Sequence, residues 1–301
     1  MSEPRVFFYV QHLLGIGHLA RASRIASALA ADRFDVTVVT GGSKVSGFPG
    51  PDVKSIALPT VLAGNAGFSG LADEYGNPVD DEFLARRRDL LLDALHHTRP
   101  DIVIIEAFPF GRRQMRFELL PLLDAIEAIL PRPKLLSSVR DILQERTKPG
   151  RDEETVSIIK AHFDHILVHG DPSFATLPDT FPLANEIADR IIYTGLVAGP
   201  APVEPSEVFD IVVSAGGGAV GLDLIRSSLE VATQTTFRGS WCLITGPNLP
   251  ERDFTALLAD APGNVSVVRF RQDFPSLLKG AELSISQAGY NTVCDILRAQ
   301  C

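Results

Sequence analysis

The chain has 301 residues, of which 45% are hydrophobic and 22% are charged, and its formal net charge is -9 at pH 7. This length fits about two α/β domains, and the acidic balance disfavours non-specific binding to nucleic acid. The three cysteines, Cys242, Cys294 and Cys301, lack metal-ligand spacing and favour reduced thiols in a cytoplasmic protein. No signal peptide and no bilayer-spanning stretch is recognisable in the sequence. Peripheral contact with a membrane stays open.

The first two-thirds of the chain alternate between apolar runs that are typical of strands and segments with helical spacing. The apolar runs predict strands over 5–11, 35–42, 53–58, 101–106, 134–139, 165–169 and 190–195. The helical spacing predicts helices over 18–30, 80–97, 113–130 and 152–163. The segment from Thr60 to Pro78 is glycine-rich and weakly periodic, so we expect a long functional loop there.

A proline-rich segment separates this series from a second one. Pro200, Pro202 and Pro205 follow the last strand of the first series, and little around them could form a regular element. We therefore expect a first domain over 1–196, a linker over 197–207 and a second domain over 208–301. The second series predicts strand and helix in turn over 209–215, 220–236, 241–246 and 251–261, and segments 264–270, 274–281, 282–287 and 291–300 complete the pattern.

The alternation of strands and helices in both series predicts the α/β class, with two Rossmann-like, doubly wound sheets. Ligands of such sheets bind at the carboxyl ends of the strands, which places the expected site in the cleft between the two domains. The second series has fewer elements than the first, and the chain stops inside or just after a predicted helix. We therefore expect the second domain to be incomplete.

The first glycine turn follows the first predicted strand. Gly15 and Gly17 allow a tight turn, and His18 lies at the helix N-terminus, where free backbone N–H groups attract a phosphate or another anion. The alternative is a turn whose glycines serve packing, with His18 as a cap. The segment lacks the full dinucleotide fingerprint, and no acidic residue closes the next strand, which disfavours a nicotinamide or flavin enzyme.

The second glycine turn opens the second domain. Ser214 ends a strand, and Gly216, Gly217 and Gly218 lead into a helix, a pattern that can cradle a diphosphate through backbone amides. The turn lacks the Lys-Ser/Thr pair of a P-loop, which disfavours hydrolysis of a nucleoside triphosphate. A flexible connection between strand and helix is the alternative interpretation.

A third strand, turn and helix run through residues 284–299. Gln287, Asn291 and Thr292 offer hydrogen bonds near the helix start. Asp295 lies about one turn further along, where a carboxylate can accept hydrogen bonds from ribose hydroxyls. Taken alone, Asn291 is an ordinary N-cap and Asp295 is a solvated helix residue.

A carboxylate and several arginines mark the expected ligand edge of the first domain. Glu106 ends an apolar strand, and Arg112, Arg113 and Arg116 follow it in the loop and the first helical turn. Arginine binds phosphate or carboxylate with fixed geometry. For any single arginine, a basic helix start paired with Glu118 is the preferred interpretation.

Arg140 and Asp141 follow the predicted strand over 134–139, and the same two interpretations apply to them. The sequence contains no Asp-x-Asp and no zinc motif. Its acidic clusters over 80–82 and 152–154 lie at helix starts, where the helix dipole stabilises them without a metal. The sequence therefore predicts no metal site.

Four segments taken in order, GIGHLARASRIASALA, SAGGGAVG, ITGP and SQAGYNTVCDIL, resemble family 28 glycosyltransferases, and so does the proline-rich linker among them. The resemblance implies the GT-B fold, with acceptor binding in the first domain and nucleotide-sugar binding in the second. It matches Gly15, Gly17 and His18 to the acceptor-side loop of the family, and it matches the glycines at 216–218 to the donor-side loop.

The resemblance also extends to the last helix. It matches Gly289, Asn291, Thr292 and Asp295 to the segment that carries the ribose-binding carboxylate, which is a glutamate in the family. The glutamine-containing donor segment of the family is expected beyond Cys301, so the resemblance implies that the donor domain is truncated.

Together these features predict a glycosyltransferase that moves a sugar from a nucleoside-diphosphate sugar, such as a UDP-sugar, to an acceptor hydroxyl. Inversion at the anomeric carbon, no metal and no cofactor beyond the donor are expected. His18 is the expected general base, with Glu106 and Asp141 in reserve. Expected substrate contacts come from Gly15, Gly17, Arg113 and Arg140. Expected donor contacts come from Ser214, Gly216, Gly217, Gly218, Gln287, Gly289, Asn291, Thr292 and Asp295.

Two other classes of function remain open from the sequence. The same fold hosts UDP-sugar hydrolases and epimerases, and fold alone does not decide the reaction. A non-catalytic subunit that binds a sugar nucleotide is the second alternative. The acceptor could be a glycan, a lipid-linked molecule or another small molecule.

Overall fold

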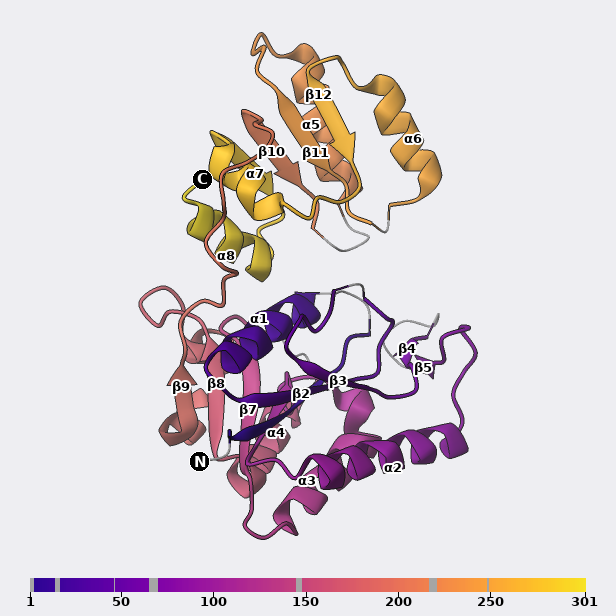
Figure 1. The fold of residues 1–301 in the computed structure, drawn as a ribbon, viewed down its shortest axis with the longest axis vertical. Helices are drawn as coiled ribbons and strands as arrows, with labels where there is room; N and C mark the ends of the chain where they lie inside the picture. The colour runs from indigo at the N-terminus through magenta and orange to yellow at the C-terminus, as the bar shows by residue number, and fades with distance from the viewer. Residues whose placement is uncertain are drawn as a thin grey trace. The chain divides into compact units, whose positions relative to one another are not determined.

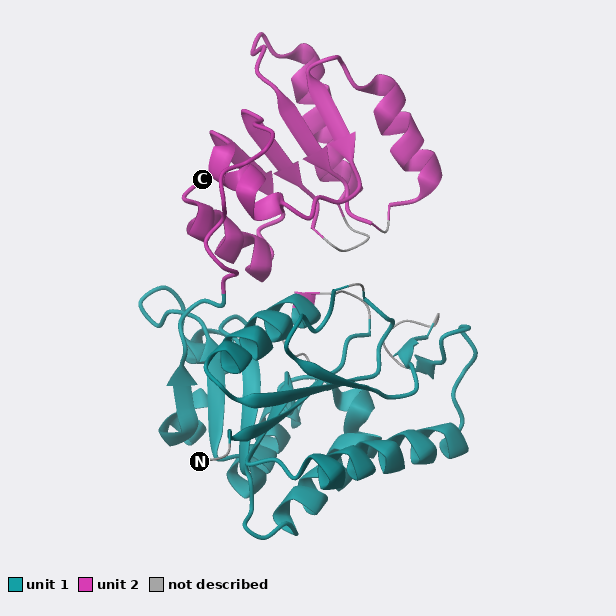
Figure 2. Ribbon diagram, in the orientation of Figure 1, with its two compact units in different colours: residues 1–14, 18–197 teal, residues 15–17, 198–301 magenta. Residues whose placement is uncertain are grey.

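The structure is a computed structural model that describes residues 3–13, 17–45, 47–64, 70–144, 148–216, 221–247 and 249–301. The chain divides into two compact units (Figure 2). Unit 1 comprises residues 1–14 and 18–197, and unit 2 comprises residues 15–17 and 198–301. Each unit has its own sheet and its own hydrophobic core, so the two are described separately.

Unit 1 contains a parallel seven-stranded sheet in the order β3-β2-β1-β6-β7-β8-β9. Strand β1 lies between β2 and β6, and its residue Tyr9 lies opposite Val39 of β2 on one side and Ile105 of β6 on the other. Nearly continuous apolar runs form these strands, as expected for a parallel sheet covered on both faces. The strands are β1 (Arg5–Val10), β2 (Asp35–Thr40), β3 (Lys54–Ala57), β6 (Ile102–Glu106), β7 (Lys134–Arg140), β8 (His165–His169) and β9 (Ile191–Tyr193).

Four α-helices accompany this sheet within the described residues: α1 (Gly17–Ala31), α2 (Asp81–Thr98), α3 (Arg116–Glu127) and α4 (Arg151–His162). Figure 1 shows α1 on the opposite side of the strands from α2 and α3. Asp80 caps α2, because its carboxylate accepts the backbone N–H of Phe83 at 2.8 Å. Three 3-10 segments complete the unit: η1 (Arg113–Met115), η2 (Leu177–Asp179) and η3 (Ala184–Arg190).

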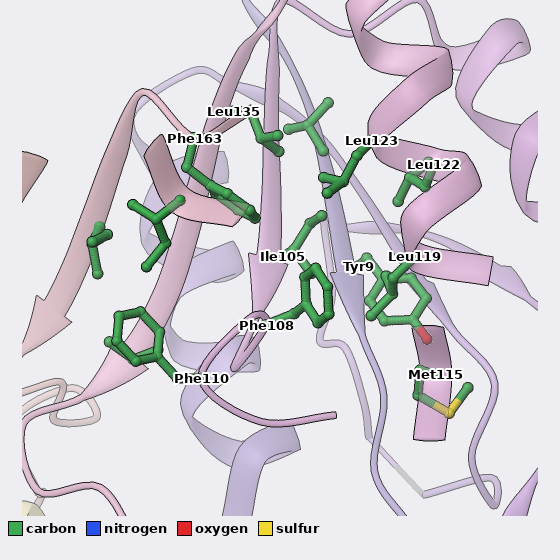
Figure 3. Packing of buried hydrophobic residues seen from close by; sticks show 14 of the residues in the cluster. Tyr9, Ile105, Phe108, Phe110, Met115, Leu119, Leu122, Leu123, Leu135 and Phe163 are labelled. Atoms are coloured by element: carbon green, nitrogen blue, oxygen red, sulfur yellow. The ribbon is translucent and has the colours of Figure 1, made fainter. Parts of the chain in front are cut away.

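The core of unit 1 lies between one face of the sheet and the helices that cover it (Figure 3). Alternate strand residues such as Tyr9 and Ile105 point into it, where they meet Leu119 and Leu123 of α3. Burying such side chains contributes about 1.5–3 kcal/mol each. The other face is also covered, since Phe8 is fully buried. Both faces of the sheet are therefore covered, which leaves the ends of the strands as the places where a ligand can bind.

A fully buried ion pair joins two helices to this core. Arg87 of α2 meets Glu118 of α3 through Nε–Oε2 at 2.8 Å and Nη2–Oε1 at 3.0 Å. Tyr9 donates its hydroxyl to Glu118 Oε1 at 2.5 Å, and Arg87 also donates to the side chain of Gln11 at 2.7 Å and to the carbonyl of Gly41 at 3.2 Å. The network therefore fixes the positions of α2, α3 and the segments that follow β1 and β2.

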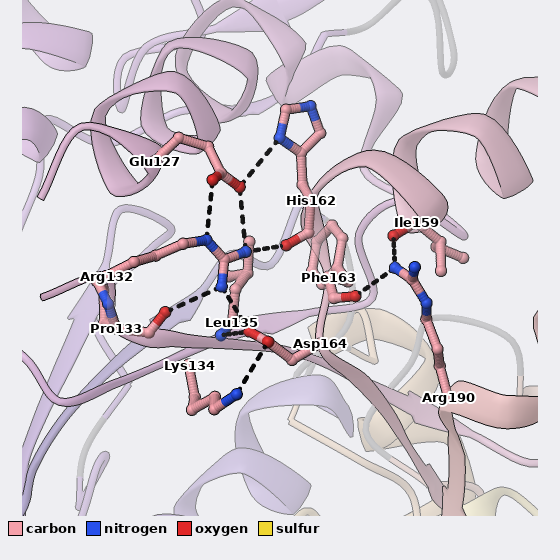
Figure 4. A network of polar contacts seen from close by, with 10 residues as sticks. All are labelled: Glu127, Arg132, Pro133, Lys134, Leu135, Ile159, His162, Phe163, Asp164 and Arg190. Atoms are coloured by element: carbon pink, nitrogen blue, oxygen red, sulfur yellow. Dashed lines mark hydrogen bonds and ion pairs between the residues drawn. The ribbon is translucent and has the colours of Figure 1, made fainter.

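A second polar network lies where β7 and β8 begin (Figure 4). Arg132 binds Glu127 at the end of α3 through two bonds of 2.9 and 3.0 Å, and it binds Asp164 at 2.7 Å. Asp164 in turn accepts the backbone N–H of Leu135 at 2.8 Å. These charges are partly exposed, and they tie the ends of α3 and α4 to the sheet.

The segment expected to be one long loop contains regular structure. Its described residues form an antiparallel pair of short strands, β4 (Leu62–Ala63) and β5 (Leu71–Ala72). A turn follows, in which the Asp73 carboxylate accepts the backbone N–H groups of Tyr75 and Asn77 at 2.9 and 2.8 Å. The expectation of an irregular loop was wrong for these residues, because strands of two residues leave no periodicity in the sequence.

Unit 2 contains a parallel four-stranded sheet in the order β12-β11-β10-β13. Its strands are β10 (Ile211–Ser214), β11 (Trp241–Ile244), β12 (Val265–Val268) and β13 (Leu283–Ser286). Its helices are α5 (Leu222–Gln234), α6 (Glu251–Asp260), α7 (Phe274–Gly280) and α8 (Tyr290–Ala299). Val213 points to the face that packs on α5 and α6, whereas Val212 points to the face that packs on α7 and α8.

The two parallel sheets confirm the predicted α/β class with Rossmann-like halves. The single helix predicted over 113–130 was wrong in its bounds. It begins as the 3-10 turn η1, directly after the left-handed Arg112, and its last α-helical residue is Glu127. Among the helices that the structure describes, none combines the length and the apolar character that a membrane span needs.

Candidate functional site

The strand order of unit 1 reverses next to β1. The chain moves from β1 to β2 and β3 on one side, and then crosses to β6 on the other side. Ligands of doubly wound sheets bind at the carboxyl ends of the strands at such a switch point. His18 lies in the first turn of α1, which follows β1, and Glu106 is the last residue of β6. The two side chains therefore meet at the expected ligand edge.

Glu106 is a fully buried carboxylate held by charges and hydrogen bonds. Its Oε1 atom lies 3.0 Å from Nδ1 of His18 and also accepts a hydrogen bond from Arg21, while its Oε2 atom accepts the Ser138 hydroxyl at 2.6 Å. Burial by itself raises the pKa of Glu106, but the charge of Arg21 and the bonds from His18 and Ser138 outweigh it and hold the pKa at about 2. Glu106 is therefore ionised at neutral pH.

His18 has the protonation state of a general base. Burial lowers the pKa of His18 below its ordinary value of 6.5, and Glu106 only partly opposes this effect. A carboxylate can only accept a hydrogen bond, so the contact with Glu106 places the proton of neutral His18 on Nδ1. Nε2 is then the nitrogen that can take a proton, and 36% of the side chain is exposed to reach a substrate.

A chain of hydrogen bonds extends from Glu106 through Ser138 to the residues beyond it. The Ser138 hydroxyl of β7 lies 2.9 Å from Nε2 of His169, the last residue of β8, and Nδ1 of His169 lies 2.7 Å from the Thr194 hydroxyl. Burial, followed by the charge of Arg21, lowers the pKa of His169 to about 4. Neutral His169 therefore donates to Ser138 from Nε2 and accepts from Thr194 at Nδ1, which fixes the direction of each bond.

Sequence reasoning missed Ser138 and His169. Both lie near the carboxyl ends of apolar strands, in the position that drew attention to Glu106. A search for every polar residue at such strand ends would have found them.

The other residues predicted for the first domain have different surroundings. Arg113 forms an ion pair with Glu154 of α4, and its side chain is 43% exposed. Arg140 ends β7 at the same edge as Glu106. Asp141 accepts the backbone N–H of Ile142 at 2.8 Å and is buried. Gly17 begins α1, and Gly15 lies outside the described residues.

In unit 2, the structure brings the second and third motifs together. The strand order reverses at β10, because β11 lies on one side of it and β13 on the other. Ser214 at the end of β10 is the register partner of Ser286 at the end of β13. The turns that follow these two strands therefore leave the sheet side by side, at its switch point.

The structure describes the two ends of the glycine turn after β10, at Gly216 and Gly221. Gly216 has a φ of 73° and donates its N–H to the Ser214 hydroxyl at 3.3 Å. At the far end, a Cβ atom on Gly221 would lie 2.2 Å from the Cβ of Ala215, so only glycine fits there. Gly217 and Gly218 lie outside the described residues.

The third motif leads into α8. Gln287 lies in the turn, Gly289 is the N-cap of α8, and Asn291 and Thr292 lie in its first turn. Asp295 follows four residues after Asn291, which places both on the same helix face. Asp295 is only 7% exposed, so the interpretation as a solvated helix residue was wrong. In the described part of the chain, no cluster of His, Cys, Asp and Glu side chains could hold a metal ion.

Comparison with known proteins gives the fold. No family model and no curated protein sequence matches this chain. Among solved structures, the calicheamicin glycosyltransferase CalG4 is 16% identical to this chain. The match covers 99% of this chain and 78% of CalG4, with a TM-score of 0.59. MurG of Acinetobacter baumannii is 14% identical over 99% of this chain and 76% of its own, with a TM-score of 0.55.

A UDP-N-acetylglucosamine 2-epimerase from Rickettsia bellii is also similar, at 11% identity over 95% of this chain and 74% of its own, with a TM-score of 0.52. At such identities, the likeness shows the architecture. The chain therefore shares its GT-B fold, with two Rossmann-like sheets, with these structures. The narrower resemblance to family 28 stays a prediction.

Proposed function

We propose that this protein is a glycosyltransferase that moves a sugar from a UDP-sugar to an acceptor hydroxyl with inversion and without a metal. The observation that carries the proposal is the contact of 3.0 Å between Nδ1 of His18 and Oε1 of Glu106 at the switch point of unit 1. A neutral histidine oriented by a buried carboxylate is suited to remove a proton from a hydroxyl group.

In the proposed reaction, the acceptor oxygen attacks the anomeric carbon while its proton passes to Nε2 of His18. The bond between the anomeric carbon and the diphosphate breaks, and UDP leaves with the electron pair. Glu106, already ionised, stabilises the imidazolium that forms on His18. The turn at Gly216 and the start of α8 are proposed to hold the diphosphate, and Asp295 is proposed to accept hydrogen bonds from the ribose.

The second candidate is a UDP-sugar hydrolase or epimerase, which the likeness to the Rickettsia bellii epimerase favours. In a hydrolase, water takes the place of the acceptor. Free sugar released from a UDP-sugar without any acceptor would identify hydrolysis, and interconversion of the UDP-sugars themselves would identify epimerisation. UDP binding without turnover of any UDP-sugar would identify a non-catalytic subunit.

The test combines nucleotide binding with turnover. UDP, GDP and dTDP are titrated calorimetrically into the wild-type chain and into His18→Ala, and UDP release is followed with a panel of UDP-sugars and acceptors. His97→Ala is the matched control, because His97 is exposed at the end of α2. We expect His18→Ala to lower turnover by about 10²- to 10⁴-fold with unchanged UDP affinity, and His97→Ala to change neither.

Normal turnover in His18→Ala would remove His18 from the mechanism. Failure of all three nucleotides to bind would overturn the proposal of a sugar-nucleotide enzyme.

A further inference from the structure

The loop after β6 brings a second arginine to the ligand edge of unit 1. Ala107 donates its N–H to the carbonyl of Ser138 at 2.8 Å, and Gly111 donates to the carbonyl of Ala107 at 2.6 Å, which closes the loop into a tight turn. Arg112 follows with left-handed angles, φ 58° and ψ 29°, and immediately precedes η1 as its N-cap. The turn therefore returns Arg112 to the end of β6, the strand that Glu106 terminates.

Two of the three guanidinium nitrogens of Arg112 are buried, although the residue as a whole is partly exposed. Its Nε and Nη2 atoms are both inaccessible to solvent, and neither has a hydrogen-bond partner in the part of the chain that the structure describes. Burial lowers the pKa of Arg112, and the charge of Glu106 opposes that effect. An arginine keeps its charge at neutral pH, and a buried charged donor without a hydrogen-bond partner destabilises the protein.

The nearby carboxylate does not satisfy this arginine. Both oxygens of Glu106 are already engaged, Oε1 by His18 and Arg21 and Oε2 by Ser138. The positive charge of Arg112 also helps to lower the pKa of His18, after the larger effect of burial. Nε and Nη2 of Arg112 lie along one edge of the planar guanidinium, an arrangement that suits a bidentate oxyanion.

We propose that Arg112 binds an oxyanion, a carboxylate or a phosphate group, that the acceptor carries beside the hydroxyl to be glycosylated. The inference rests on the proposed function only in calling the ligand an acceptor. An anionic group bound at Arg112 would place the neighbouring hydroxyl against Nε2 of His18. The acceptor class is then an acid or a phosphate ester, and neutral alcohols of the same shape are poor substrates.

Direct binding is tested by NMR of the arginine side chains of the whole chain. The Nε–H signal that disappears in Arg112→Lys is followed during titration with inorganic phosphate and, separately, with acetate, against sodium chloride at matched ionic strength. Arg113→Lys is the matched control, because Arg113 is the adjacent residue and is already paired with Glu154. We expect the Arg112 signal to shift with phosphate, with acetate or with both, and the stronger anion identifies the acceptor group.

An Arg112 signal that neither anion shifts beyond the chloride control would overturn the proposal. This measurement requires no turnover, so it stands even if the protein transfers no sugar.

A kinetic experiment compares pairs of acceptors that differ only at the acidic group. The group is a free acid in one acceptor of each pair and a neutral ester in the other. A hydrogen bond to a charged group contributes about 1.5–3 kcal/mol. We therefore expect Arg112→Gln to raise KM for the anionic acceptor about 10- to 100-fold and to leave the neutral acceptor nearly unchanged. An equal loss for both acceptors would overturn the anion site while sugar transfer itself remained established.

Discussion

Glu106 sets the basicity of His18. Burial makes the imidazole a weaker base, whereas the carboxylate restores part of its proton affinity by a hydrogen bond and by charge. Because Glu106 remains ionised down to a pH of about 2, it performs this role over the whole range in which His18 titrates. The pair therefore behaves as one base whose strength is adjusted by one carboxylate.

The pH dependence of kcat/KM should show this coupling. A general base works in its deprotonated form, so activity should rise with pH through the pKa of His18, with a midpoint below 6.5. Glu106→Gln removes the carboxylate that raises the pKa of His18. The midpoint of the pH profile should therefore move to still lower pH, and the plateau of kcat/KM should fall. An unchanged midpoint in Glu106→Gln would show that the two side chains are not coupled.

Sequence reasoning found His18 and Glu106 because each has a recognisable place beside a strand end. It selected Arg113 for a substrate contact and left out Arg112, the neighbouring residue of the same type. The choice depends on the left-handed backbone of Arg112, and an arginine at a positive φ has no signature in a single sequence. In the structure, Nε and Nη2 of Arg112 are buried, whereas Arg113 is paired with Glu154 of α4.

Helices α2 and α3 are positioned by the buried pair of Arg87 and Glu118. Glu118→Gln keeps the shape of the side chain but leaves the charge of Arg87 buried and uncompensated. We expect a loss of about 3–5 kcal/mol in the free energy of unfolding of unit 1. Glu127→Gln is the control, since its bonds with Arg132 are partly exposed and are worth about 1 kcal/mol or less. Urea unfolding followed by far-UV circular dichroism measures both, and equal losses would contradict the prediction.

At this scale, the sequence predicted most of what periodicity encodes. The strands of both sheets follow apolar runs, and most helices begin and end within a few residues of the expected bounds. The exceptions are short elements with little period to detect: β4, β5, η1, η2 and η3. The pairing of β10 with β13 depends on contacts between distant residues, so spacing alone could not place Ser214 opposite Ser286.

Each of the two units packs its own sheet, and the sequence contains a single tryptophan. Trp241 is buried in the core of unit 2, so its fluorescence reports on that unit, while circular dichroism reports on both. We expect the two signals to give different urea midpoints, and we expect Glu118→Gln to shift only the transition that Trp241 does not report. One coincident transition that moves as a whole would contradict this, and the same experiment tests the expected division into 1–196, 197–207 and 208–301.

The position of the site residues at strand ends also has a consequence for mutational tolerance. Glu106 and Ser214 each occupy the last residue of a strand whose register is fixed by neighbours on both sides. Segments such as the one that carries β4 and β5 lie outside those sheets. A library that varies the length and composition of that segment should therefore change which acceptors are accepted while the reacting groups keep their places. One inserted residue within β6 would turn Glu106 to the opposite face, and no replacement of a loop could compensate for it.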